Sequence, residues 1–498
     1  MSCLQLALTV RAGRVTIDIL HDDVLLLIFY FDGPGGGSQV QYPSWHRLVH
    51  VCRRWRSLVF ASPNFLDLRL VCGPKTRVEL IGVWPPLPIV IRDANILTKP
   101  EDYGFDIAMH RARVREINLD SLTNWQLEQL DSTMQEPFPA LTRLRLNLHL
   151  NSYPAPALSD GFLIGSAPHL RSLELYSIEF PALPKLLLSA TNLVTLINFY
   201  NITDSGYISP ETLVTLANLE LLIIQIPISH PDRERRHPRP PTRTALSALT
   251  RFDFQGPSEY LEDFVAMIDA PLLDSIHISC MPISEESIFN LSQLGRFMGR
   301  TTAFQELNEV HVFFNCDEVE VNALPPAPTY WGQTVSNRAK FKIEREFSNL
   351  ELRSVARILA GFFPSICTVE HLHVSYPYYL MTDWISAVES VQRLEIFRPF
   401  TAVKNLYLCH ELAQCVAPAL QELVGDPESV ANVLPALESI FLEDLEPSGP
   451  VQEAIGQFVA ARQALGHPVA VSNWNWIGHK RCYTLDIYGH QRPLGIST

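Results

Sequence analysis

The chain has 498 residues, of which 47% are apolar and 18% are charged, and its formal net charge is −14. The charged share is below the roughly 25% of average globular chains, so intrinsic disorder of the whole chain is excluded. The acidic balance argues against a general nucleic-acid-binding protein. The length indicates either several ordinary domains or one long repeat array.

Cysteine usage and hydropathy describe the expected environment of the protein. The nine cysteines include no CxxC pair, so a disulfide scaffold is not expected. No basic region precedes the apolar N-terminal stretch, and the longest uncharged apolar run, Val24 to Phe31, is far shorter than the about 20 residues of a membrane span. We therefore expect a protein of the cytoplasm, the nucleus or both, with no membrane partner.

Two helices are predicted near the N-terminus. Asp22 or Asp23 is a suitable cap for a short apolar helix over residues 23–30, which the glycine-rich segment 32–38 interrupts. A second helix is predicted over residues 44–65, because its apolar side chains recur at helical spacing, and Pro63 ends it.

After Pro63 the pattern changes to short strands, 66–71 and 87–92, and then to a repeated LxxLxL signature. In such a segment the fourth and sixth side chains point to the core, and those between them face the opposite side, because side chains alternate along a strand. The signature begins at Val114, Leu141, Leu170, Leu193, Leu219, Leu249, Leu273, Leu307, Val369, Val403 and Leu437. A degenerate copy is predicted at Arg338, halfway across the one long interval.

Short strands at such intervals, joined by helix-like segments such as 182–192 and 209–218, are typical of a leucine-rich-repeat solenoid. We therefore predict an α/β protein: a small helical module at 15–66, then an irregular horseshoe of about 12 or more strand–helix units over 67–470. A helix at 451–465 suits a terminal cap. The tail 471–498 matches no repeat and is left unassigned.

The segment from Ile17 to about Leu66 resembles an F-box, the helical module that binds a Skp-type adaptor in cullin-based ubiquitin ligases. The residues 20–29 (LHDDVLLLIF) fill the frame with which F-boxes open, and 51–58 (VCRRWRSL) match their later V-[CS]-[RK]-x-W-[RK]-x-[LI] pattern. Together with the repeats, the chain resembles fungal F-box proteins with divergent leucine-rich repeats. His21 stands where F-boxes have proline, and the glycines 33–37 lengthen the junction between the helices.

The resemblance implies the substrate-recognition subunit of an SCF-type ubiquitin ligase, which binds the adaptor, through it a cullin scaffold, and on its repeats an unidentified target protein. The side chains expected to divide between an internal core and the adaptor surface are Leu20, Val24, Leu25, Ile28, Phe29, Leu48, Val51, Cys52, Trp55 and Leu58. The alternative is a leucine-rich-repeat scaffold that binds partners without any ligase.

On the repeats, alternation predicts which side chains face a bound target. The candidates are Arg143, Arg145, Ser172, Glu174, His371 and His373. His371 and His373 share one face and are near enough to reach a metal ion or an acidic group, but we interpret them as solvated histidines. The carboxylates of 318–321 (EVEV) are interpreted in the same way.

No catalytic motif was found in the sequence. The segment 410–414 (HELAQ) lacks the second histidine with which HExxH binds zinc, and no GxSxG sequence is present. We therefore expect a non-catalytic protein with no metal and no cofactor.

Overall fold

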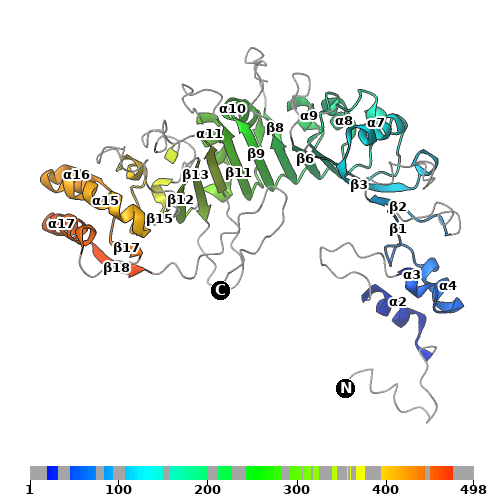
Figure 1. Cartoon of the computed structure of the whole chain (residues 1–498), viewed down its shortest axis with the longest axis horizontal. Helices are drawn as coiled ribbons and strands as arrows, with labels where there is room; N and C mark the ends of the chain where they lie inside the picture. The colour runs from blue at the N-terminus through cyan, green and yellow to red at the C-terminus, as the bar shows by residue number, and fades with distance from the viewer. Residues whose placement is uncertain are drawn as a thin grey trace, which may run out of the picture. The chain divides into compact units, whose positions relative to one another are not determined.

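The structure is a computed structural model, and it describes residues 19–31, 45–73, 84–92, 107–149, 157–165, 167–199, 210–226, 243–281, 291–305, 307–315, 318–324, 339–344, 356, 359–360, 366–375, 394–443 and 449–474. The described chain divides into two compact units, residues 1–193 and 194–498 (Figure 1). Among the helices of these residues, none has the length and apolar character needed to cross a bilayer.

Unit 1 begins with three helices and continues with parallel strands paired in the order β1-β2-β3-β4-β5. Its elements are α2 (Asp22–Phe31), α3 (Trp45–Leu48), α4 (Arg53–Ala61), β1 (Leu70–Cys72), β2 (Ile89–Arg92), β3 (Val114–Leu122), α7 (Asn124–Thr133), β4 (Arg143–Leu148), β5 (Ser172–Tyr176) and α8 (Leu183–Ser189).

The described residues of unit 2 repeat the alternation of strand and connecting segment up to residue 474. Its elements are β6 (Thr195–Phe199), α9 (Pro210–Val214), β7 (Leu221–Gln225), β8 (Thr244–Ala245), β9 (Arg251–Pro257), α10 (Ser258–Ala266), β10 (Ile268–Asp269), β11 (Ser275–Met281), α11 (Ser292–Arg300), β12 (Glu309–Asn315), β13 (Glu318–Leu324), β14 (Ala339–Glu344), β15 (His371–Ser375), β16 (Asn405–Leu408), α15 (His410–Glu422), α16 (Pro427–Asn432), β17 (Ser439–Glu443), α17 (Pro450–Ala464) and β18 (Ala470–Trp474).

The predicted repeat pattern is confirmed at the level of the strands. Every LxxLxL segment contains a strand, and its fourth and sixth side chains are buried, as with Leu144 and Leu146 or Ile440 and Leu442. The predicted helices 182–192 and 209–218 contain α8 and α9. The mixed α/β class and the leucine-rich-repeat-like arrangement of parallel strands and connecting helices are therefore present in the structure.

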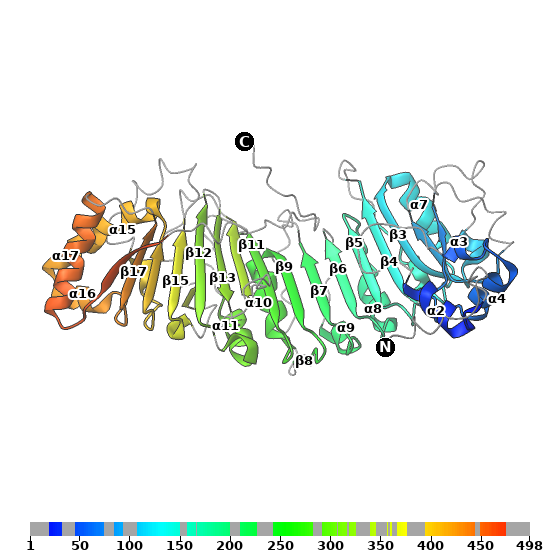
Figure 2. The same cartoon turned by 90° about the horizontal axis from the view of Figure 1, so that it is seen from below.

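The order of the strands differs from the prediction in the middle of unit 2. The degenerate copy at Arg338 is a strand, β14, but it pairs with β11, and the spatial order is β11-β14-β13-β12-β15 (Figure 2). Only two residues separate β12 from β13, too few for a crossover, so these strands form an antiparallel pair. The segment EVEV is thus a strand with Val319 and Val321 buried, while the Glu320 carboxylate on the other face is 22% exposed and lies 2.9 Å from Lys340.

Two other boundaries change. The second predicted helix is two helices, α3 and α4, because the backbone leaves the helical path at residues 49–52 and Cys52 caps α4 with an extended conformation. At the other end, β18 pairs with β17, so residues 471–474 of the predicted tail continue the sheet, and 475–498 lie outside the described residues.

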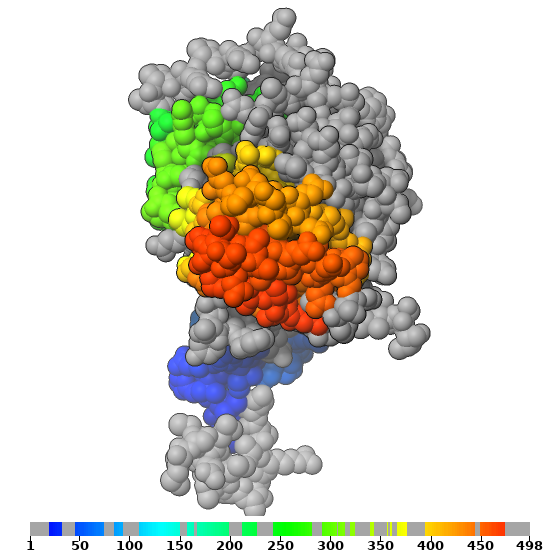
Figure 3. Space-filling view, turned by 90° about the vertical axis from the view of Figure 1, so that its left-hand side faces the viewer, coloured from blue at the N-terminus to red at the C-terminus, as the bar shows by residue number. Residues whose placement is uncertain are grey.

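The C-terminal end of unit 2 is covered by helices, as the prediction of a cap helix requires. Figure 3 looks onto this end, where the orange and red residues of α16 and α17 form the surface. Arg462 of α17 is 1% exposed, and its guanidinium donates to backbone carbonyl oxygens of Val430, Val433 and Pro435 at 3.1–3.3 Å. One buried cation thus joins α17 to α16 and to the turn that follows it.

Candidate functional site

Helix α2 is apolar on two faces, and its inner face packs on α4. Leu25 and Phe29 lie one turn apart and are buried, and the Phe29 ring lies 4.6 Å from the ring of Trp55. Residues at i and i+4 share one face of a helix, so this pair forms the internal contact of the module.

Arg54, one of three arginines in the VCRRWR segment, fixes the start of α2. Arg54 donates to the Asp22 carboxylate at 2.6 and 3.0 Å and to the backbone carbonyl of Leu20 at 2.6 Å. A carboxylate in the first turn also suits the positive end of the helix dipole. Arg54 and Trp55 together therefore set the position of α2 on α4.

The outer face of α2 is apolar and exposed. Val24, Leu27, Ile28 and Phe31 recur at i, i+3, i+4 and i+7, and between 42% and 78% of each residue is exposed. Such spacing places all four on one stripe of the helix. We call these four residues the outer stripe. A continuous exposed apolar stripe is a candidate interaction surface.

The structure divides the predicted adaptor residues into three groups. Val24, Ile28 and Val51 are exposed; Leu20, Cys52, Trp55 and Leu58 are half-buried; and Leu25, Phe29 and Leu48 are buried. The last three cannot touch a partner in this conformation, so their place on the adaptor surface is corrected to the internal core. Leu27 and Phe31 were missed, although their i+3 and i+7 spacing from Val24 was available as a signal.

The predicted target-binding residues of unit 1 lie on neighbouring strands and are already paired. Arg143 of β4 lies 3.6 Å from the Glu116 carboxylate, which also contacts Arg69. Arg145 lies 3.5 Å from Asp120 and 3.8 Å from Glu174, and its guanidinium stands 5.3 Å from the centre of the Tyr176 ring. This face is an alternating network of cations and carboxylates.

Ser172 and Glu174 belong to the same network. The Ser172 hydroxyl donates to Glu174 at 3.1 Å, and the Tyr176 hydroxyl donates to the other carboxylate oxygen at 3.4 Å. Burial, followed by the charge of Glu174, raises the pKa of Tyr176 to about 12. Ser172 is 8% exposed, so its prediction as a target contact is corrected: it orients Glu174 instead.

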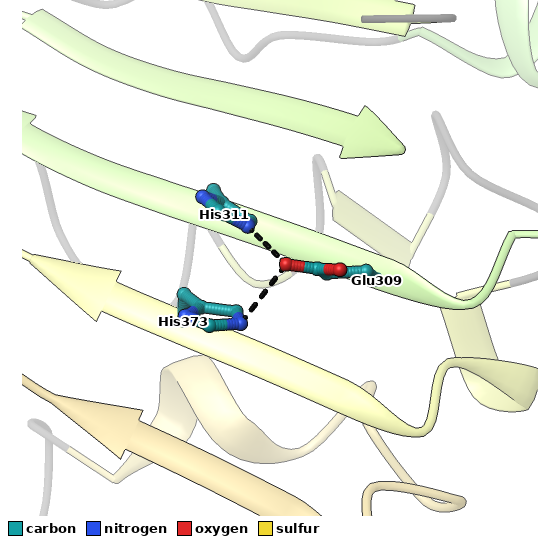
Figure 4. Close-up of side chains that lie close together, drawn as sticks. All are labelled: Glu309, His311 and His373. Carbon is teal, nitrogen blue, oxygen red and sulfur yellow. Dashed lines mark hydrogen bonds and ion pairs between the residues drawn. The ribbon is translucent and has the colours of Figure 1, made fainter. Parts of the chain in front are cut away.

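In unit 2, two histidines from different strands meet one carboxylate (Figure 4). Oε1 of Glu309 lies 2.6 Å from Nε2 of His311 and 3.0 Å from Nε2 of His373. Glu309 and His311 are two residues apart on β12, and His373 is the register partner of His311 on β15. We call these three residues the histidine–glutamate cluster.

The cluster is recessed and keeps its carboxylate ionised. The side chains of both histidines are 11% exposed and that of Glu309 is 27% exposed. Burial alone would raise the pKa of Glu309, but the hydrogen bonds and charges of His311 and His373 outweigh it and hold this pKa well below its ordinary value. The site therefore contains a carboxylate anion at neutral pH.

A stack of rings extends from the cluster across four strands. The ring of His373 lies 4.2 Å from that of His311 and 4.0 Å from that of Tyr407, and Tyr407 lies 4.5 Å from Phe441. Strand register places the four residues in one row, because His311, His373, Tyr407 and Phe441 are successive partners. We call this row the ring ladder.

The interpretation of His371 and His373 as solvated histidines was wrong for His373, which is 9% exposed and bonded to Glu309. His371, the register partner of Glu309, instead contacts the amide nitrogen of Asn405 through Nδ1 at 3.3 Å. Glu309 and His311 were missed. A usable signal was that LNEVHV and VEHLHV place histidine at the same fifth position of two copies.

No protein-family model and no curated protein matches the chain. Among solved structures, it is similar to the leucine-rich-repeat-containing protein LegL7 from Legionella pneumophila, at 13% identity over 82% of this chain and 91% of that chain. The TM-score of that comparison is 0.27, which carries no argument about fold or function. The leucine-rich-repeat-like fold rests instead on the strands, register and burial of this chain.

Proposed function

We propose that this protein is a non-catalytic substrate receptor of an SCF-type ubiquitin ligase, acting in the cytoplasm, the nucleus or both. Its N-terminal helices α2–α4 dock on a Skp-type adaptor and through it on a cullin scaffold. The exposed face of its repeat strands holds a target protein. The leucine-rich-repeat-like fold supports the coarser part of this proposal, a protein-interaction scaffold.

The outer stripe is the observation that carries the proposal. A ten-residue helix that exposes four large apolar side chains on one face cannot cover them with its own module. The opposite face of α2 is occupied by Trp55, and Arg54 holds its first turn, both from the VCRRWR segment by which the chain resembles an F-box. The stripe suits a helical partner groove better than a polar surface.

The function that follows is tethering. Holding a target and a ubiquitin-loaded enzyme on one assembly makes the transfer effectively intramolecular and raises the effective concentration of the target. The receptor then supplies binding surfaces rather than reacting groups.

The test is binding of the full chain to a purified Skp-type adaptor, measured by calorimetry. Ile28→Glu places a charge in the outer stripe without touching the Phe29–Trp55 contact, and we expect it to weaken binding at least about tenfold, since a buried unpaired charge is costly. Leu188→Glu on α8 is the matched control, because Leu188 is equally apolar and 51% exposed. Trp55→Ala is unsuitable, because that ring supports the inner face of α2.

The alternative function is a scaffold that binds partners without a ligase. No binding by the unsubstituted protein, or equal binding by the Ile28→Glu and Leu188→Glu variants, would reject the receptor proposal. The scaffold would then remain as the function of the repeats.

A further inference from the structure

We propose that Glu309, His311 and His373 form a recessed binding site for a divalent transition-metal ion of the zinc class on the face of β12 and β15 opposite the buried valines Val310 and Val312. Two imidazole nitrogens and one carboxylate oxygen are a donor set that zinc uses in sites with an open fourth position. The inference does not depend on the adaptor-binding role of α2.

The ligand atoms are already gathered. One ligand atom from each of the three side chains lies within 4.8 Å of the others, and both Nε2 atoms approach the same carboxylate oxygen (Figure 4). Around tetrahedral zinc, ligand atoms stand about 3.3 Å apart, given metal bonds of about 2.0–2.2 Å. The present contacts of 2.6 and 3.0 Å must therefore open by less than about 1 Å to admit an ion.

The strands, rather than a loop, hold the three ligands. Glu309 and His311 share a face because they are two residues apart, and parallel register brings His373 beside His311. Tyr407 stacks on the other side of His373 at an angle of 1° between ring planes. Ligands placed on paired strands lose little conformational entropy when a metal binds.

A neighbouring amide gives a second, independent observation. Asn322 of β13 is the register partner of His311 in the antiparallel pair, so the two side chains share one face. Asn322 is 5% exposed, and its Nδ2 donates to Glu320, but its Oδ1 is buried with no hydrogen-bond partner among the described residues. A buried carbonyl oxygen without a donor indicates a group absent from the protein itself, such as a metal-bound water.

The donor set also selects the ion. Imidazole ligands favour zinc and its neighbours, whereas Mg²⁺ and Ca²⁺ prefer sites built from oxygen alone. Three protein ligands would leave one position of a tetrahedral ion unfilled by the cluster. That position suits water or one donor side chain of a bound protein.

Metal binding exchanges existing bonds. The proton on each Nε2 must move to Nδ1 or to solvent, because only an unprotonated ring nitrogen donates to a metal. The hydrogen bonds from the two histidines to Glu309 are then replaced by three metal–ligand bonds, and the carboxylate charge neutralises part of the charge of the ion.

The experiment is titration of the full, untagged and chelator-treated chain with Zn²⁺ by calorimetry and with Co²⁺ by visible absorption. We expect one equivalent of each to bind, with a cobalt spectrum that has tetrahedral bands but no thiolate charge-transfer band, and no response to Mg²⁺. His311→Ala and His373→Ala should each weaken binding at least about tenfold, since loss of a direct ligand exceeds the loss of an outer-shell partner.

His371→Ala is the matched control, because His371 lies on the same strand two residues from His373 but bonds Asn405. It should bind Zn²⁺ as the unsubstituted chain does. Glu309→Gln, which keeps the shape of the side chain, provides a second loss variant if a histidine variant fails to fold by circular dichroism. Absence of stoichiometric binding, a thiolate band, or equal affinity in the Glu309→Gln and His371→Ala variants would overturn the proposal.

Discussion

At the fifth position of the repeat, β4 and β5 in unit 1 carry Arg145 and Glu174, whereas β12 and β15 in unit 2 carry His311 and His373. In unit 1 the two side chains attract each other, and each has a further polar partner. In unit 2 the two rings stack, and both bond to a third residue, Glu309. The same backbone position thus carries a network of paired charges in one unit and a recessed histidine–glutamate cluster in the other.

The comparison indicates that the exposure of a charged side chain, rather than its residue type, decides how much it contributes to the free energy of unfolding. Arg143 is 55% exposed, so water and salt screen its ion pair with Glu116. Arg462 in unit 2 is 1% exposed, so water does not screen its contacts, and its removal leaves partners without a donor. Stability measurements on matched variants can test this contrast.

The largest effect is expected at Arg462. Arg462→Leu removes a buried cation from its carbonyl partners at the C-terminal end of unit 2 and leaves those oxygens without their donors. We expect the free energy of unfolding to fall by about 3 kcal/mol, because several hydrogen bonds from one charged group are lost together. Urea unfolding followed by circular dichroism measures it. A decrease of the free energy of unfolding below about 1 kcal/mol would show that apolar packing of the leucine offsets the lost hydrogen bonds.

A smaller loss is expected in the ring ladder. Tyr407→Ala removes the ring that lies between His373 and Phe441 and should cost about 2 kcal/mol, less than the about 3–5 kcal/mol of a fully buried aromatic. Tyr407→Phe retains the ring and is the control, with a change below about 0.5 kcal/mol. Equal losses in both variants would assign the contribution to the hydroxyl instead of the stack.

The sequence predicted where the strands of this protein lie along the chain better than it predicted which strands pair with each other. Positions such as Leu144, Leu146, Ile276 and Ile278 follow from alternation alone, since burial on one face of a strand is local information. The position of β14 beside β11 does not follow, because strand order depends on long-range pairing that the pattern within one strand does not record. A prediction from the repeat pattern alone places the strands side by side in chain order, and it cannot reveal that β14 and β12 exchange places.

The same dependence on long-range strand pairing explains which residues of the candidate sites the sequence did not predict. His373 was predicted to face outward with His371, because the two residues share a strand and a face. Its actual partners, Glu309 and His311, come from a strand 62 residues earlier in register, and that pairing is long-range. In the N-terminal module, apolar spacing predicted one helix over 44–65, where the structure has α3 and α4. Only the packing of Phe29 on Trp55 distinguishes the inner face of α2 from the outer stripe.

A pH-dependent loss is expected at Asp253 on β9. Burial alone would raise the pKa of its carboxyl, but hydrogen bonds from His277 and Arg251 outweigh it and lower this pKa below the ordinary 3.8. Its other register neighbour, Ile223, is apolar. The ionised form is therefore favoured by folding, so the stability it gives is present above pH 3.8 and is lost as the pH falls toward the lowered value.

Asp253→Asn tests this dependence. At pH 7 the variant should unfold about 1–2 kcal/mol more easily than the unsubstituted chain, the usual contribution of hydrogen bonds to a charged group. The difference should shrink as the pH falls from 3.8 toward the lowered value, because the carboxyl of the unfolded chain is then protonated and folding must remove that proton to form the charged hydrogen bonds. Urea unfolding at several pH values measures the difference, and a gap that stays constant in this range would contradict the assignment.

The smallest effect is expected at Arg143, the exposed counterpart in unit 1. Arg143→Ala breaks an ion pair at 3.6 Å to Glu116, but Glu116 keeps its contact with Arg69, so no buried charge is left alone. We expect a change of about 0.5 kcal/mol or less at low salt, which decreases further when salt is added. A loss comparable with that of the Arg462→Leu variant would contradict the contrast between the units, since it would mean that an exposed pair is as strong as a buried one. A small loss would instead leave the face of unit 1 free to exchange its internal pairs for those of a bound target at little cost to stability.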